Sequence, residues 1–298
     1  MSRIGLRERI EQGLLILDGA MGTQLIARGI APGVCNDNLN VESPEIVLDV
    51  QRAYIAAGSE AIITNTFGAN KYTLSRHGLG DKAEEINRAG VRLAREAAGD
   101  DRYVLGDIGP TGDFLEPLGL LKGDELKEAF AAQARGLADG GADGIIVETM
   151  TAVDEAQITV EAVRSVCELP IFVSFAFDPV GDDFRTMMGV DVSGAVSRLA
   201  GLGIDAIGFN CGTLSLEGYT RLAAKFVETV SSKSAKVKIL AEPNAGRPEL
   251  VGSQAAYRVS PKDYAAAVEK IYAAGVTIIG GCCGTTPAHI EALARKLK

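Results

Sequence analysis

Histidine is nearly absent from this 298-residue sequence, which contains only His77 and His289. Metal hydrolases build their centres largely from histidine, so a hydrolase of that class is difficult to assemble from this chain. We expect both histidines to be surface residues of helices.

An excess of basic charge is also lacking. Thirty Lys and Arg stand against 39 Asp and Glu, which gives a net charge of −9. No run of basic residues stands out, and a nucleic-acid or anionic-membrane surface requires one. We therefore expect neither nucleic acid nor a membrane as a partner.

The sequence also lacks long apolar runs, and its number of cysteines is odd. The first nine residues are charged and never become the apolar core of a signal peptide, and no stretch is long and apolar enough to span a bilayer. Five cysteines argue against a disulfide framework. These features predict a cytoplasmic protein, and nothing in them indicates an oligomeric state.

A repeating pattern of short apolar segments is present instead. Apolar residues make up 47% of the chain and charged residues 23%, as in ordinary globular proteins. Eight β-branched segments are each followed by a loop and by helical periodicity. They are Leu14–Leu17, Ala61–Thr64, Tyr103–Gly106, Gly144–Val147, Ile171–Phe175, Ala206–Phe209, Val237–Ala241 and Val276–Ile279. The pattern predicts one α/β domain over residues 1–298, a (β/α)8 TIM barrel with its site at the C-terminal end of the strands.

Helix starts and long loops fit this barrel. Ser43, Ser260 and Thr286 each precede a proline, an arrangement typical of an N-cap followed by the first helical residue. The longest predicted strand-to-helix loops cover residues 19–42, 110–123 and 178–191, on the face where barrel enzymes keep their chemistry.

Polar side chains follow every predicted strand. They are Asp18, Asn65, Thr66, Asp107, Glu148, Thr149, Asp178, Asn210, Cys211, Glu242, Asn244, Cys282 and Cys283. In a closed barrel these residues share one rim, so Cys211 should lie one strand away from the Cys282-Cys283 turn. Thiolates are soft ligands suited to Zn²⁺, and a catalytic zinc keeps three protein ligands and one open position. We expect these three cysteines to bind one zinc ion.

Other interpretations of the cysteines remain open. Cys282 and Cys283 could form a strained vicinal disulfide or be inert buried thiols. We place Cys167 on the opposite rim as a packed residue. Cys35 lies in the first long loop, and we leave it out because a fourth thiolate would close the coordination sphere.

Seven motifs spread over nearly the whole chain resemble the homocysteine S-methyltransferase family. They are Leu17-Asp18-Gly19-Ala20-Met21-Gly22-Thr23, Thr64-Asn65-Thr66-Phe67, Gly106-Asp107-Ile108-Gly109-Pro110-Thr111, Val147-Glu148-Thr149, Gly208-Phe209-Asn210-Cys211, Glu242-Pro243-Asn244-Ala245-Gly246 and Gly280-Gly281-Cys282-Cys283-Gly284-Thr285-Thr286-Pro287. Within the family, the resemblance is to the homocysteine-binding module of the cobalamin-dependent enzymes.

The resemblance implies a zinc barrel in which the sulfur of homocysteine takes the fourth place beside the three cysteines. It also implies that Asp18 and Glu148 lie near the substrate amino group. The Gly19–Thr23 turn, including Ala20 and Met21, and Thr64 or Asn65 would surround the substrate carboxylate. Asn244 would either orient a ligand or close a turn, and for Asp107 and Thr111 a backbone turn competes with substrate contact.

The methyl donor is less determined than the acceptor. The sequence of the first motif resembles the corrinoid-dependent branch of the family. We therefore expect the methyl donor to be methylcobalamin carried on a separate protein. The fifth loop departs from the family pattern, with Asp182, Asp183, Met187 and Met188. This departure leaves open S-methylmethionine or betaine as donor and another thiol as acceptor. The same three cysteines could also serve a non-catalytic module that binds a thiol or senses zinc.

Overall fold

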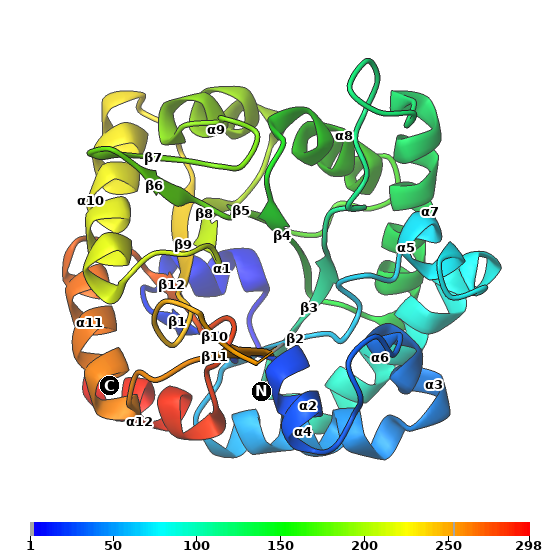
Figure 1. Cartoon of the computed structure of the whole chain (residues 1–298), viewed down its shortest axis with the longest axis horizontal. Helices are drawn as coiled ribbons and strands as arrows, with labels where there is room; N and C mark the ends of the chain where they lie inside the picture. Colours follow the sequence, from blue (N-terminus) through cyan, green and yellow to red (C-terminus); the bar gives the residue numbers. More distant parts are fainter. Residues whose placement is uncertain (1–2, 253) are drawn as a thin grey trace.

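Eight parallel strands form the centre of the molecule in a computed structural model, which describes residues 3–252 and 254–298 (Figure 1). They are β1 (Leu15–Ile16), β2 (Ala61–Ile63), β3 (Tyr103–Ile108), β4 (Gly144–Met150), β5 (Ile171–Phe175), β8 (Ala206–Asn210), β9 (Lys238–Glu242) and β12 (Ile278–Ile279). Their order is β1-β12-β9-β8-β5-β4-β3-β2, and every neighbouring pair is parallel. The predicted (β/α)8 barrel is confirmed.

The seam between β1 and β2 is closed by side chains as well as backbone. Glu60 donates its backbone N–H to the Ile16 carbonyl at 2.7 Å. Further along the seam, the Asp18 carboxylate accepts the Ile63 N–H at 3.1 Å. The predicted site residue Asp18 is therefore also part of the barrel closure.

Helices surround the strands and, in the case of α1, lie across one end of the barrel (Figure 1). They are α1 (Leu6–Glu11), α2 (Gly22–Ala27), η1 (Asn36–Asn38), α3 (Leu39–Glu42), α4 (Pro44–Ala56), α5 (Lys71–Ser75), η2 (Gly80–Lys82), α6 (Ala83–Ala98), α7 (Gly123–Gly140), α8 (Val153–Arg164), α9 (Val192–Leu199), η3 (Ala200–Leu202), α10 (Leu216–Ser232), α11 (Pro261–Ala273) and α12 (Pro287–Leu297). None of these described helices combines the length and apolar character needed to cross a membrane.

The core has two layers. The larger cluster fills the space between the strands and the outer helices, as with Val47 of α4 and Phe226 of α10. A smaller cluster inside the barrel includes Phe172 of β5 together with Leu6 and Ile10 of α1. Helix α1 therefore plugs the end of the barrel that lies opposite the predicted site.

Several strands extend further than predicted. Strands β3, β4, β8 and β9 include Asp107, Glu148, Asn210 and Glu242, which were expected to follow them. A hydrogen-bonded ladder tolerates polar side chains when they point into a cavity. These four side chains are consequently fixed by strand backbone.

Two short hairpins were not predicted. Antiparallel strands β6 (Asp178–Val180) and β7 (Asp183–Arg185) lie in the fifth loop, and β10 (Glu249–Val251) and β11 (Gln254–Ala256) follow β9. Both contain too few apolar residues to produce a strand pattern. The first long loop likewise contains α2, η1 and α3.

The three predicted helix starts are at the right positions, but the side chains there do not all make the expected cap hydrogen bond. Ser260 caps α11 by accepting the Asp263 N–H, whereas the Ser43 side chain makes no cap bond to α4. Thr286 forms a capping box with His289. The expectation that His289 is a surface residue is wrong, because it is only 6% exposed and its Nε2 lies 3.0 Å from the Val259 carbonyl.

His77 is exposed as expected, although it follows α5 in a turn and does not belong to a helix. Cys167 follows α8, before β5, and is partly buried against the core as predicted.

Candidate functional site

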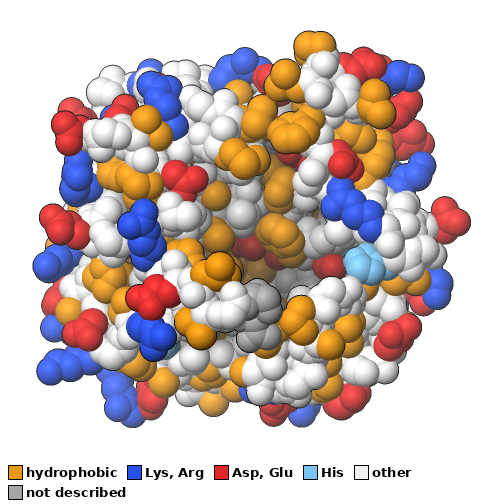
Figure 2. All heavy atoms as spheres, in the orientation of Figure 1, with side chains coloured by type: hydrophobic (Ala, Val, Ile, Leu, Met, Phe, Trp, Pro, Cys, Tyr) orange, Lys and Arg blue, Asp and Glu red, His pale blue; other side chains and the backbone are white. Residues whose placement is uncertain are grey.

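A cavity of about 400 Å³ opens at the C-terminal end of the strands. Figure 2 shows it as the hollow near the centre of the viewed face, with acidic side chains at its floor. The loops after β1 and β2 form one wall, and the ends of β3, β4, β8, β9 and β12 complete it.

Three thiols meet at one side of this cavity. The sulfur atoms of Cys211, Cys282 and Cys283 all lie within 4.8 Å of one another, and no other group of this kind occurs among the described residues. The Sγ atoms of Cys282 and Cys283 are 3.9 Å apart, far beyond the length of a disulfide. Two sulfurs on a tetrahedral zinc with bonds of about 2.3 Å would be about 3.8 Å apart. The three thiols fit the metal that the sequence predicts.

Unusual backbone conformations bring the thiols together. Cys211 has a φ of +52°, in the left-handed region that side chains rarely adopt. Thr149, with a φ of +59°, is also at the rim. Ser234 is the one other described non-glycine residue with positive φ. Such strain persists where the surroundings enforce it, and it concentrates at functional sites.

Hydrogen bonds among the thiols shift the pKa values of Cys282 and Cys283 in opposite directions. Hydrogen bonds from Cys211 and Cys282 lower the pKa of Cys283 to about 3. The hydrogen bond with Cys211 and burial raise the pKa of Cys282 above its usual value. One sulfur of the cluster therefore carries a negative charge readily, which is the form that binds metal.

Four carboxyl groups line the floor of the cavity beside the thiols: Asp18, Asp107, Glu148 and Glu242. Burial raises the pKa of every one, and that of Glu148 reaches about 8. One oxygen each of Asp18, Asp107 and Glu242 has no hydrogen-bond partner among the described residues. Buried carboxylates without partners are costly, so this floor is prepared for a ligand that supplies positive charge or N–H groups.

Asn210 connects the acids to the thiols. Its Oδ1 accepts from the Thr149 N–H at 2.9 Å and from the Ser174 hydroxyl at 2.8 Å. Its Nδ2 lies 3.3 Å from Glu148 Oε2 and 3.8 Å from Cys282 Sγ. This fully buried amide thus holds Glu148 next to the sulfur cluster.

The model of the homocysteine S-methyltransferase family matches residues 15–297. The chain belongs to the homocysteine S-methyltransferase family.

Two groups of relatives illustrate this family. The methionine synthases of Mycobacterium tuberculosis and Mycobacterium leprae are each 33% identical over 309 residues, covering 97% of this chain and 25% of the relative. The chain therefore spans about a quarter of the length of these relatives. The metallated homocysteine methyltransferase MmuM from Escherichia coli is 26% identical with a TM-score of 0.79, covering 98% of this chain and 99% of that one. The apo form of MmuM superposes with a TM-score of 0.72.

Most residues predicted for substrate binding line the cavity of this family member. They are Asp18, Gly19, Ala20, Met21, Thr64, Asn65 and Glu148. Asn244 is buried behind the cavity wall, where its Nδ2 donates to the Gly212 carbonyl at 2.8 Å. It thereby fixes the turn that follows Cys211.

Three buried tyrosines support the site from the outer helices. Tyr54 of α4 donates to the Ala20 carbonyl at 2.9 Å, and Tyr264 of α11 donates to the Gly280 carbonyl at 2.7 Å. Tyr219 of α10 donates to the Cys211 carbonyl at 2.5 Å. Sequence reasoning missed them because each lies in an ordinary amphipathic helix.

Thr285 is another missed residue. Its hydroxyl accepts the Ala20 N–H at 3.0 Å and donates to the Cys282 carbonyl at 2.7 Å. A Cβ on Gly19 would lie 2.7 Å from this hydroxyl. The Gly19 turn therefore rests directly on the turn that carries two of the thiols.

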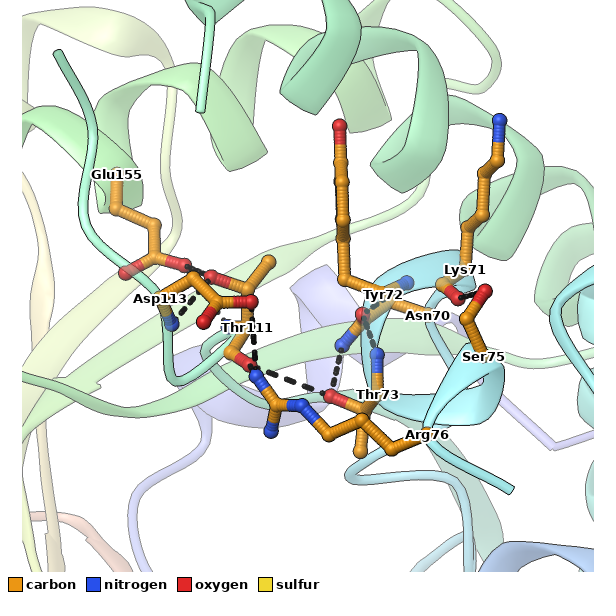
Figure 3. Close-up of polar contacts among 9 residues, drawn as sticks. All are labelled: Asn70, Lys71, Tyr72, Thr73, Ser75, Arg76, Thr111, Asp113 and Glu155. Carbon is orange, nitrogen blue, oxygen red and sulfur yellow. Dashed lines mark hydrogen bonds and ion pairs between the residues drawn. The ribbon is translucent and has the colours of Figure 1, made fainter. Parts of the chain in front are cut away.

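The third loop is anchored beside the cavity (Figure 3). Glu155 Oε1 accepts from both the N–H and the hydroxyl of Thr111, at 2.9 and 2.8 Å. Arg76 donates to the Thr111 carbonyl at 2.9 Å and to Asp113 at 2.8 Å. Thr111 does not line the cavity, so its contacts have the turn-building character that the sequence left open.

Cys35, Asp37 and His77 also line the cavity. Cys35 lies outside the three-sulfur group, in agreement with its exclusion from the metal ligands. Asp37 accepts the Gly68 N–H at 2.8 Å, and burial raises its pKa to about 6. This carboxyl group ties the first loop to the second.

Proposed function

We propose that this protein is a zinc-dependent methyltransferase that transfers a methyl group to the thiol of homocysteine and forms methionine. The observation that carries the proposal is the placement of three clustered thiols and four carboxyl groups, three of them buried, in one cavity. A substrate with a thiol at one end and an ammonium group at the other matches this arrangement.

Cys211, Cys282 and Cys283 would hold one zinc ion, which would bind the substrate sulfur and favour its thiolate form. Three protein thiolates more than offset the charge of the ion, so the substrate sulfur stays electron-rich. No other general base is then required to prepare the nucleophile.

Asp18 and Glu148 would bind the substrate ammonium. Asp18 has a free Oδ1, and Asn210 holds Glu148 close to the sulfur cluster. The ammonium would supply a positive charge next to these two acids, and it would favour their ionised forms. The Gly19–Met21 turn with Thr64 and Asn65 would surround the carboxylate of the substrate.

For the donor, we propose a methyl-corrinoid carried on a partner protein. A cavity of about 400 Å³ is too small to enclose a corrinoid, so that donor would act from the mouth. Exposed apolar side chains occur on the third, fifth and seventh strand-to-helix loops: Leu118 is 73% exposed, Leu120 93%, Met187 69% and Leu250 80%. Side chains of this type suit a transient protein contact.

A second candidate donor is a small cation such as S-methylmethionine. The described residues that line the cavity include five acids and no Lys or Arg, which favours a cation. The acids of the fifth loop contribute less than their number suggests, because Asp183 is paired with Lys225. The cation would therefore be attracted by the floor of the cavity more than by the loop.

The test is an activity panel with the zinc-loaded protein, homocysteine and one donor at a time: methylcobalamin, a methyl-corrinoid protein, S-methylmethionine, betaine or S-adenosylmethionine. Methionine formed fastest from a corrinoid donor supports the proposal. Far faster turnover with S-methylmethionine replaces the corrinoid with the small cation. Binding of zinc and homocysteine without transfer from any donor would point to a non-catalytic module.

A further inference from the structure

Two neighbouring turns of the barrel rim receive opposite ends of the substrate in the proposed function. The first turn, residues 18–21, follows β1 and would bind the ammonium and carboxylate groups. The thiol turn, residues 280–285, follows β12 and carries Cys282 and Cys283, which would hold the sulfur end through zinc. Strands β1 and β12 are paired in parallel, so the two turns leave the barrel side by side. The distance between the turns therefore sets the length of molecule that can reach both.

Thr285 connects the two turns through one hydroxyl group. This residue is fully buried and does not line the cavity. Its Oγ1 accepts the Ala20 N–H of the first turn at 3.0 Å and donates to the Cys282 carbonyl of the thiol turn at 2.7 Å. A hydroxyl has a single hydrogen, so none remains for a ligand. The side chain of Thr285 consequently serves the two turns and can affect a substrate only through them.

Further contacts hold the turns together on both sides of this hydroxyl. The Gly281 N–H donates to the Asp18 carbonyl at 2.9 Å. A Cβ on Gly19 or on Gly281 would lie 2.7 Å from Thr285 Oγ1, so a glycine on each turn allows the close approach.

Tyr54 of α4 covers the junction from the outside. Its hydroxyl lies 2.9 Å from the Ala20 carbonyl and 3.2 Å from the Thr285 carbonyl, one on each turn. Close packing of this kind resists a change in spacing, because any shift opens a void or forces a clash.

We propose that Thr285 is a positioning residue that fixes the spacing of the two turns and thereby selects the chain length of the thiol acceptor. The inference rests on the proposed function and deepens it. Homocysteine would engage both turns at once, whereas cysteine is one methylene shorter and would engage only one of them. A pre-organised spacing favours the molecule that fits it and gives no advantage to a shorter one.

The test is calorimetry of the zinc-loaded protein with three ligands: L-homocysteine, L-cysteine and L-2-aminobutyrate, which has the amino-acid end and no sulfur. Thr285→Val keeps the branched shape and removes the hydroxyl. We expect the affinity for L-homocysteine to fall about tenfold, the scale of lost buried hydrogen bonds, and the other two affinities to stay within about twofold. The preference for homocysteine over cysteine then falls with the first value.

Three variants serve as comparisons. Thr285→Ser retains the hydroxyl and should keep the wild-type preference. Thr159→Val on α8 removes another fully buried hydroxyl, which donates to the Glu155 carbonyl at 2.8 Å, and should change no affinity. Tyr54→Phe removes the phenol at the same junction and should lower the preference in the same direction. This last variant tests the proposal if Thr285→Val does not fold.

The outcomes separate a role in spacing from simple support of one turn. An unchanged preference in Thr285→Val overturns the proposal. An equal loss of affinity for L-2-aminobutyrate would show that Thr285 shapes only the first turn, and a loss of zinc would show that it supports only the thiol turn. Either result also overturns it.

Wild-type protein decides whether the proposed function itself stands. If it binds neither zinc nor homocysteine, the proposed function fails and this inference fails with it. If it binds both, and Thr285→Val shows the same preference between the two thiols, only the role of Thr285 is contradicted.

Discussion

Acidic side chains have different surroundings at the two ends of the barrel. At the N-terminal end, Asp143 pairs with Arg3 and Arg95 and also accepts the Val104 N–H at 2.7 Å. Glu60 and Asp205 repeat this pattern: each precedes a strand, pairs with two basic side chains, and accepts a backbone N–H from the neighbouring strand. Each of these three acids has compensating charge.

At the C-terminal end, the four acids on the floor of the cavity have no basic partner among the described residues. Asp107 and Glu242 are at most 4% exposed, and each has an oxygen without a hydrogen bond. Acidic residues therefore stabilise one end of the barrel through ion pairs. At the other end they line a pocket in which some of their oxygens lack hydrogen-bond partners. The difference fits the general division of this fold into a stability face and a functional face.

The strongest test of this division removes a thiol from the functional face. Cys211→Ala should abolish tight zinc binding and reduce methyl transfer at least about 1,000-fold, because two thiolates cannot hold a catalytic zinc. The fold should remain. Metal analysis and circular dichroism check this, with Cys167→Ala as the matched control that keeps full zinc. Full zinc occupancy in Cys211→Ala would remove this residue from the site.

A smaller effect is expected from the acid beside the thiols. Glu148→Gln should weaken homocysteine binding by about 1.5 to 3 kcal/mol, the cost of a lost charged hydrogen bond, and should leave zinc bound. Calorimetry with the zinc-loaded protein measures the change. Unchanged affinity would mean that Glu148 does not contact the ammonium group.

The opposite face should respond in stability and not in activity. Asp143→Asn removes two partly exposed ion pairs, which we expect to lower the free energy of unfolding by about 2 kcal/mol. The rate per folded molecule should stay within about twofold of wild type. Denaturant unfolding and initial rates measure the two quantities, and a selective loss of rate would contradict the division between the two ends.

The smallest predicted effect is an increase in stability. Burial, followed by repulsion from Glu148, raises the pKa of Asp107 well above its usual value of about 3.9. The folded protein then binds more protons than the unfolded chain, so this group costs stability as the pH rises above that value. Asp107→Asn should therefore raise the Tm of metal-free protein by a few degrees at pH 8 and by less at pH 5. An equal shift at both pH values would show that the charge of Asp107 is not responsible.

Much of this organisation was predictable from the sequence. The eight apolar segments predict the barrel, and polar residues at their ends predict that Cys211 meets Cys282 and Cys283, because the fold brings all strand ends to one rim. Periodicity carries this information. It also gives the helix starts, although the position of Ser43 did not guarantee a side-chain cap.

The side-chain contacts that hold the site residues in place were not predictable. Asn210 was expected only as a polar residue at a strand end, and its contacts to Glu148 and Cys282 depend on a side-chain orientation. The burial of His289 depends on packing against Tyr264, with the two rings 5.5 Å apart. Contacts between distant segments leave no periodic signal, so only the folded structure reveals them.

The tyrosines on α4, α10 and α11 have a consequence for transplanting this chemistry. Tyr54, Tyr219 and Tyr264 reach the site turns from behind, so the positions of three outer helices determine where those turns lie. A design that copies only the cysteines and acids onto another barrel would leave the turns free to relax. The set of residues to be transferred is therefore larger than the cavity lining, and it includes three helical positions that do not line the cavity.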